Sequence, residues 1–66
     1  MIRYYKRTDI KDIIYMDDPK RDRLMIYTVA HGILGWYYTE FRHSDIDCGC
    51  FEFIEADEAD VMLELL

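Results

Sequence analysis

The sequence lacks the motifs that mark most enzymes. Its 66 residues contain no catalytic motif, no phosphate-binding loop, no zinc-finger spacing and no internal repeat. The aspartates at 17 and 18 and at 45 and 47 stand without a nucleophile or the glycine of a calcium loop, so we interpret them as turn formers and solvated loop charges. We therefore expect a protein that is not an enzyme and that needs no cofactor.

Long hydrophobic runs are also missing. The basic residues Arg3, Lys6 and Arg7 are not followed by an apolar run, which is atypical of a secretory signal. Residues 24–39 contain no Asp, Glu, Lys or Arg, but this stretch is too short for a membrane span and includes two glycines. We expect a cytoplasmic protein, located in the host cell cytoplasm if a phage encodes it.

Cysteine is scarce, and its placement excludes a disulfide framework. The two cysteines, Cys48 and Cys50, are two residues apart, and a bridge that closes so short a loop hardly restricts the unfolded chain. With 52% hydrophobic and 15% aromatic residues the chain is expected to fold, although a core of this size is marginal by itself. We therefore expect a homo-oligomer, most simply a two-fold dimer.

Basic residues are scarce after the first third of the chain. The net charge is −6, yet residues 1–23 carry +2 and residues 24–66 carry −8, and no Lys or Arg occurs in the last fifteen positions. Such a surface repels phosphate, so we expect no direct binding of nucleic acid. The charge favours a basic protein as the partner.

Alternating apolar and polar residues predict an antiparallel β-sheet. The strands are expected at residues 2–7, 12–17, 24–30, 33–42 and 50–56. The first is polar and is interpreted as an edge strand, whereas 24–30 is apolar on both faces and is expected at the centre of the sheet, covered on both sides. A turn or helical start is expected at residues 8–11 and a loop at residues 43–49.

Two turns and one helix complete the predicted fold. Pro19 fixes φ in the turn of residues 17–22, and Gly32 tolerates the positive φ of a tight reversal. Asp57 is expected to cap a C-terminal helix with the apolar stripe Ala59, Met62, Leu63 and Leu66. The prediction is an α+β protein: a small, meander-like antiparallel β-sheet of four to five strands with one C-terminal α-helix, in a single domain over residues 1–66, dimerising.

The acidic C-terminal half is the predicted partner-binding surface. Spaced carboxylates on a rigid strand and helix imitate the phosphates of nucleic acid, and large aromatic rings serve as anchors at interfaces. The residues expected to bind the partner are Glu52, Glu55, Asp57, Glu58, Asp60, Glu64, Trp36 and Tyr38. The apolar residues expected at the oligomer interface are Val61, Met62, Leu65 and Leu66.

Cysteine and histidine support an alternative hypothesis, a small redox or metal-responsive module. Cys48 and Cys50 share a face if the segment is extended, near the upper limit for a disulfide, and such a bridge is readily reduced. His43 and His31 would complete a tetrahedral zinc set with them. An interpretation without a functional site is favoured. In it the two cysteines are small buried thiols, His31 is a turn residue and His43 is solvated.

A third hypothesis is an oligomer that sequesters a small ligand at its subunit interface. Tyrosine and tryptophan rings would stack on the ligand, and Arg3, Lys6 or Arg7 would hold an anionic group. The ten aromatic residues of the chain leave enough rings for such a role, although a two-sided sheet can also bury them.

In size, acidity and absence of catalytic residues the chain resembles, as a type, the small inhibitors that phages and mobile elements make against CRISPR and restriction systems. The resemblance is one of format and covers no motif of a particular family. It implies a viral protein that acts as a nucleic-acid mimic. The leading hypothesis is a non-enzymatic, acidic protein that blocks or modulates a larger, basic, nucleic-acid-handling partner.

Overall fold

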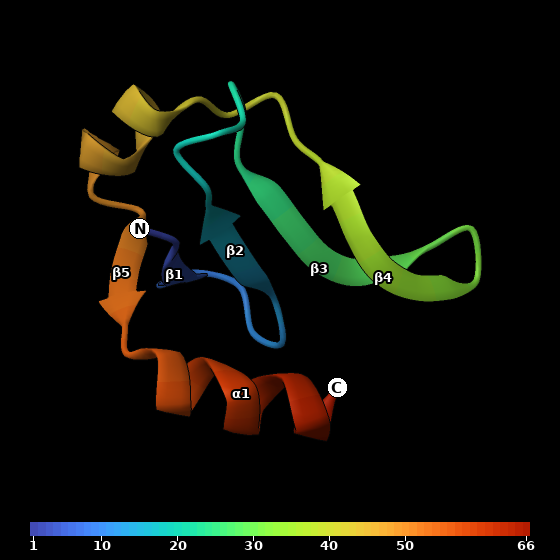
Figure 1. The fold of residues 1–66 in the computed structure, drawn as a ribbon. Coiled ribbons are helices and arrows are strands. Elements are labelled where there is room, and N and C mark those ends of the chain that lie inside the picture. Colours follow the sequence, from blue (N-terminus) through green and yellow to red (C-terminus); the bar gives the residue numbers. More distant parts are fainter.

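Five antiparallel strands and one C-terminal helix form the protein (Figure 1). The computed structural model describes the backbone of residues 1–66 and every side chain except that of Cys48. The elements are β1 (Arg3–Arg7), β2 (Ile14–Asp17), β3 (Met25–Ala30), β4 (Ile33–Tyr38), the 3₁₀ helix η1 (His43–Cys48), β5 (Phe51–Ile54) and α1 (Ala56–Leu65). The strand order β4-β3-β2-β1-β5 confirms the predicted α+β fold, and its first four strands form a meander.

The prediction that the first strand lies at an edge is wrong. Strand β1 lies between β2 and β5, with Tyr5 opposite Tyr15 on one side and Phe53 on the other. Tyr5 is buried in the centre of the sheet, while the polar character of the strand comes from long side chains that reach solvent. Lys6, for example, extends to Glu52 on the neighbouring strand, with 3.3 Å between Nζ and Oε2.

The two predicted reversals are confirmed. In the β2–β3 turn, the Asp18 carboxylate accepts a hydrogen bond from the Lys20 amide at 3.0 Å, and the Asp18 carbonyl accepts one from the Arg21 amide at 2.9 Å. Between β3 and β4, His31 and Gly32 have φ values of 54° and 80°. Two consecutive residues with positive φ are the geometry of a two-residue hairpin turn that matches the twist of its strands.

Two predicted boundaries are wrong, and in both cases side-chain hydrogen bonds to the backbone explain the difference. Strand β4 ends at Tyr38 rather than at residue 42, because the Thr39 hydroxyl donates to the Leu24 carbonyl at 3.0 Å and accepts from the Phe41 amide at 3.1 Å, which turns the chain away from β3. The segment predicted as a loop at 43–49 contains η1, which Asp45 begins by accepting a 2.7 Å bond from the Arg42 amide. Residues 8–11 form bends, which agrees with the predicted turn and not with the alternative of a helical start.

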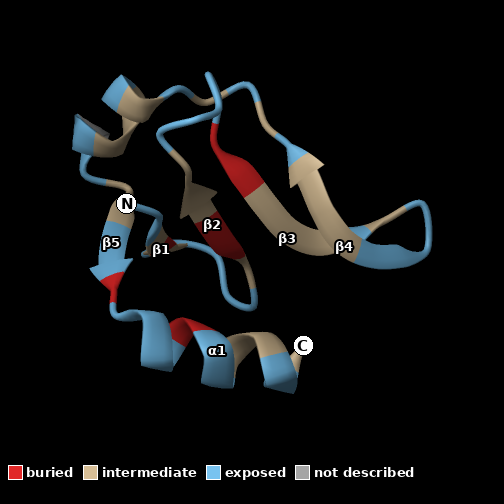
Figure 2. Ribbon diagram, viewed as in Figure 1, coloured by how far each residue is buried: buried red, intermediate tan, exposed pale blue. Residues whose placement is uncertain are grey.

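The sheet carries a core on each face (Figure 2). On one face, Tyr5, Tyr15 and Leu24 are buried, and they are covered by Phe41, which precedes η1, and by Ile46 of η1. On the other face α1 covers Ile14 and Ile54 with the predicted stripe, confirmed as Ala59, Met62, Leu63 and Leu66. The helix begins two residues earlier than predicted, with Glu55 rather than Asp57 at its N-cap.

Strand β3 lies inside the sheet, between β2 and β4, although β2 is the middle strand, and only the first half of β3 is covered on both sides. Leu24 and Met25 are buried, whereas Val29 is 62% exposed. The far end of the β3–β4 hairpin projects past α1 into solvent (Figure 1). Neither helix that the structure describes has the length and apolar character needed to cross a membrane.

Candidate protein-interaction surface

The end of β5 and the helix α1 present a one-sign charged surface. Five exposed carboxylates lie along it, which we call the acidic segment: Glu55, Asp57, Glu58, Asp60 and Glu64. Among the ion pairs between described side chains, none involves a member of this segment. The last Lys or Arg of the chain is Arg42, so the acidic segment has no Lys or Arg nearby in sequence.

Three of these carboxylates form a stripe along one side of α1. Asp57, Asp60 and Glu64 are spaced by three and four residues, which places them one above another on the same side of α1. Val61 and Leu65 are four residues apart and lie directly beside this stripe, and they are 56% and 81% exposed. The predicted partner-binding carboxylates of the helix are therefore brought together on a rigid element.

Glu52 differs from the other predicted partner-binding carboxylates. It lies on β5 opposite Lys6, with which it forms an ion pair. A pair this exposed contributes little to stability, but it neutralises the charge that Glu52 would offer to a partner. The acidic segment therefore begins after Glu52.

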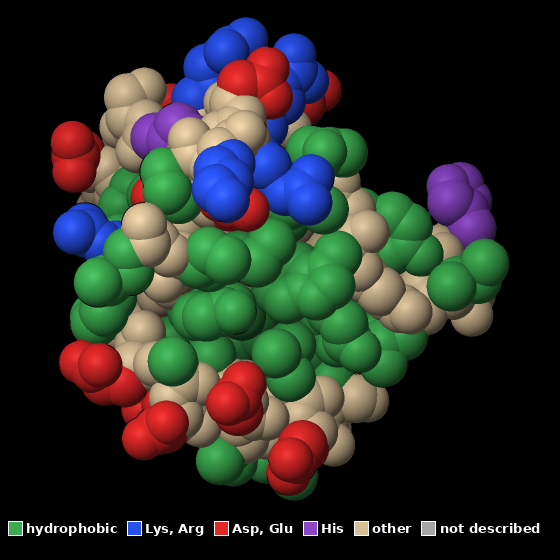
Figure 3. All heavy atoms as spheres, in the orientation of Figure 1, with side chains coloured by type: hydrophobic (Ala, Val, Ile, Leu, Met, Phe, Trp, Pro, Cys, Tyr) green, Lys and Arg blue, Asp and Glu red, His purple; other side chains and the backbone are tan. Residues whose placement is uncertain are grey.

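Beside the acidic segment lies a broad apolar surface (Figure 3). Figure 3 shows it between acidic side chains over α1 and basic side chains over the β2–β3 turn. Side chains on the same face of β3 and β4 form its outer part, which we call the open apolar face: Tyr27, Val29, Leu34, Trp36 and Tyr38. An apolar patch with a polar rim is typical of an interaction site.

The two aromatic residues predicted to bind the partner are placed differently. Trp36 is half-buried against the Ile14 core and meets Tyr27 edge to face at 5.1 Å between ring centroids. Tyr38 is 62% exposed, and its hydroxyl accepts a 2.6 Å hydrogen bond from Arg21 Nη1. Tyr38 is thus available as a surface anchor, while Trp36 also serves the core.

The residues predicted at an oligomer interface divide in the same way. Val61 and Leu65 lie on the exposed side of α1, whereas Met62 and Leu66 pack against the Ile14 core. The helix therefore offers only half of the predicted apolar surface to a partner.

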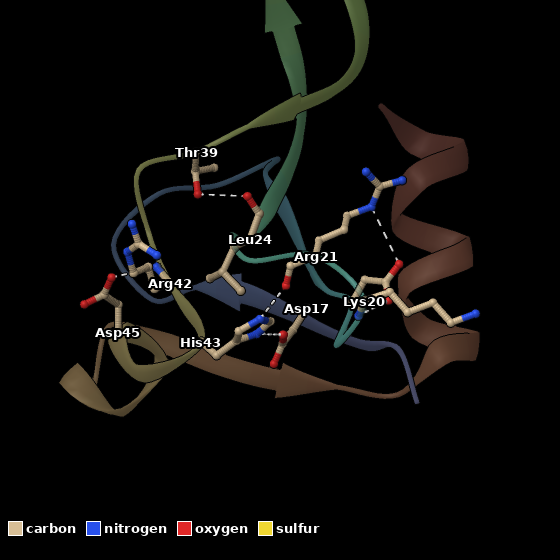
Figure 4. A network of polar contacts seen from close by, with 9 residues as sticks. Asp17, Lys20, Arg21, Leu24, Thr39, Arg42, His43 and Asp45 are labelled. Carbon is tan, nitrogen blue, oxygen red and sulfur yellow. Dashed lines mark hydrogen bonds and ion pairs between the residues drawn. The ribbon is translucent and has the colours of Figure 1, made fainter.

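His43 joins three segments and was not predicted to do so (Figure 4). From the start of η1, its Nδ1 faces the Asp17 carboxylate at the end of β2, and its Nε2 lies 2.7 Å from the Arg21 carbonyl in the β2–β3 turn. Both neighbours accept hydrogen bonds, so only the doubly protonated ring satisfies both. The Arg21 carbonyl first, and then Asp17, raise the pKa of His43 above its ordinary value.

This arrangement weakens the metal hypothesis. Both ring nitrogens of His43 are occupied, and among the side chains that the structure describes no three His, Cys, Asp or Glu residues gather as ligands. The Cys48 side chain lies outside the described residues. A redox role for Cys48 and Cys50 stays a prediction.

A cavity of about 430 Å³ opens at the end of β1 beside the loop that follows it. Its lining includes the basic residues Lys6, Arg7 and Lys11 and the apolar residues Ile10, Ile13 and Met62. Arg7 is held by two hydrogen bonds to the Asp9 carboxylate, at 2.8 and 2.7 Å, which lower the pKa of Asp9. The guanidinium also lies 5.7 Å from the Phe51 ring centroid.

Comparison with known proteins gives no match to this chain. No protein-family model, no curated protein and no solved structure is similar to it.

Proposed function

We propose that the protein is a non-enzymatic binding protein that blocks or modulates a larger, basic partner that handles nucleic acid. The observation that carries the proposal is the acidic segment beside the open apolar face. The partners that fit by chemistry include nucleases of CRISPR and restriction systems, whose grooves hold phosphates with Lys and Arg. A phage or mobile element that made such a protein would protect its genome.

Charge and apolar area contribute differently to this mode of binding. The stripe of Asp57, Asp60 and Glu64 is held on a packed helix, so little backbone freedom is lost when it meets a basic groove. Long-range attraction between opposite charges speeds the encounter and excludes acidic partners. The exposed ring of Tyr38 supplies the kind of aromatic anchor that carries affinity at interfaces.

The test compares two variants with the same change in net charge. Asp60→Lys/Glu64→Lys reverses two charges of the acidic segment, and Glu40→Lys/Asp47→Lys reverses two exposed charges elsewhere. Binding to purified RNA-guided nucleases and restriction endonucleases is measured by interferometry, with duplex DNA as the competitor. We expect the first variant to weaken binding by on the order of tenfold to hundredfold, and the second to change it little.

Salt and DNA competition complete this experiment. Wild-type binding should weaken between low and physiological salt and should be displaced by duplex DNA, because the carboxylates occupy the phosphate site. Equal losses for both variants, or no binding to any of these nucleases, would contradict the proposal.

The cavity favours a second candidate function, the capture of a small anionic ligand. Its size is within the range of small-molecule sites, and its lining combines three basic residues with apolar side chains and with the carboxylates of Asp12 and Glu52. Lys6 and Arg7 are paired with Glu52 and Asp9, so Lys11 is the cation that this function requires. We expect nucleotides or inorganic phosphate to raise the melting temperature, because a ligand that binds only the folded state stabilises it. Lys11→Gln should abolish this rise, while the exposed Lys20→Gln should retain it. Unchanged melting across the panel would exclude this function.

A further inference from the structure

Strand β4 is an edge strand without the usual protection of an edge. It lies at one end of the sheet, and its sequence from Ile33 to Tyr38 contains no charged residue and no proline. Proteins normally place lysine, proline or a bulge on such a strand, since unpaired N–H and C=O groups recruit another strand. The charge-free stretch of residues 24–39 is this hairpin together with the residues that flank it.

The hairpin register shows which backbone groups of β4 are unpaired. Ala30 and Ile33 flank the two-residue turn, so they form a hydrogen-bonded pair, and such pairs recur at every second position. Gly35 and Tyr37 therefore also point their backbone groups toward β3. The Thr39 amide donates to the Leu24 carbonyl and so continues this alternation of inward-facing and outward-facing residues. The N–H and C=O groups of the intervening residues face outward: Leu34, Trp36 and Tyr38.

We propose that β4 pairs antiparallel with β4 of a second copy of this chain and joins the two sheets into one. A two-fold axis at Trp36 places Trp36 opposite Trp36 of the second copy and Leu34 opposite Tyr38 of the second copy. In this register every outward N–H group of β4 meets a carbonyl. The contact is self-complementary, as a two-fold interface requires.

The side chains of these three residues favour the same arrangement. Leu34, Trp36 and Tyr38 point to the face that carries α1, and Leu34 and Tyr38 are 41% and 62% exposed. Pairing of β4 brings the open apolar faces of two copies together side by side. Cross-strand aromatic and aliphatic pairs stabilise such a ladder.

Charge selects β4 over α1 as the contact between copies. Each chain carries a net charge of −6, so two copies repel each other wherever their carboxylates approach. A contact through Val61 and Leu65 would bring two acidic segments together, because Glu58, Asp60 and Glu64 lie on the same helix. The β4 edge has no charge of its own, and the acidic segments remain free in the joined sheet.

The first test is the mass of the protein in solution as a function of concentration. We expect light scattering after size exclusion, and native mass spectrometry, to give twice the chain mass of 8.0 kDa. Leu34→Pro should give the monomer, since it removes an outward N–H group and leaves the bonds to β3 intact. Leu34→Lys, which keeps the backbone unchanged, should also favour the monomer. Leu65→Lys, on the exposed side of α1, should remain a dimer.

Amide hydrogen exchange gives a second, independent measurement. In the wild-type dimer the amides of Trp36 and Tyr38 should exchange about tenfold or more slowly than in Leu34→Lys, while the Gly35 and Tyr37 amides stay protected in both. A wild-type monomer at every concentration would overturn the proposal. So would a dimer that Leu65→Lys dissociates and Leu34→Lys does not, or one in which the Trp36 and Tyr38 amides exchange freely.

Discussion

Leu24→Ala is expected to lower the free energy of unfolding by about 3 kcal/mol. Leu24 is fully buried, and it packs in the core with Tyr5 and Tyr15 below the segment that carries Phe41. A protein of this size has a total stability of roughly 3–10 kcal/mol, so the loss removes a third or more of it. Urea denaturation followed by the fluorescence of Trp36 measures the change.

The backbone of Leu24 explains why this position matters beyond its side chain. Its amide donates to the Phe41 carbonyl at 3.0 Å, and its carbonyl accepts both hydrogen bonds of Thr39. A cavity left by Leu24→Ala would therefore loosen the segment of residues 39–41, which is bonded to the backbone of residue 24, as well as the core. Leu65→Ala is the matched control, because the side chain is 81% exposed and its loss should cost less than about 0.5 kcal/mol. Similar values for the two variants would refute this account.

The stability of the protein is expected to fall as the pH rises above about 6.5, the ordinary pKa of histidine. Hydrogen bonds to the Arg21 carbonyl and to Asp17 raise the pKa of His43, with further contributions from the charges of Asp17 and Asp22. A group whose folded-state pKa is raised stabilises the fold fully below its unfolded pKa, which is about 6.5 for histidine. This contribution is lost as the pH passes through the raised, folded-state pKa. Urea denaturation at a series of pH values from about 5.5 upward measures it.

The second histidine provides the control for this pH dependence. His43→Gln should flatten the profile, since its side chain does not titrate, whereas His31→Gln should leave the profile unchanged. His31 is exposed in the β3–β4 turn, where no described hydrogen bond or ion pair involves its ring. If His31→Gln flattened the profile and His43→Gln did not, the hydrogen bonds of His43 to β2 and to the β2–β3 turn would not be the origin of the pH dependence.

Local signals in the sequence account for much of the fold. Pro19 and Gly32 locate both hairpin turns, because each fixes or permits a backbone angle that few other residues allow. The helix stripe of Ala59, Met62 and Leu63 follows from spacing alone and is the one that packs on Ile14. The place of β1 in the sheet does not follow from such signals. It depends on Phe51 returning to pair with Arg7, which no local pattern encodes.

The candidate surface was predictable in its charge but not in its boundaries. The acidic residues are visible in the sequence, yet Glu52 forms an ion pair with Lys6. This pair depends on the pairing of β1 with β5, which the sequence did not predict. The role of His43 depends likewise on Asp17, which is distant in the chain. The free edge of β4 has a sequence signal, the charge-free stretch of residues 24–39, but its outward groups are identified only by the register.

The pairing of β1 with β5 affects how the chain folds during its synthesis. Strand β1 precedes the other strands of this sheet in the chain, so on the ribosome it stays without its second neighbour until β5 has left the exit tunnel. Until Phe51–Ile54 emerges, β1 is an open edge that other nascent chains can join. Premature termination before residue 51 would leave that edge open permanently and would also remove α1, which covers Ile14. Truncated products are therefore expected to aggregate and to be degraded.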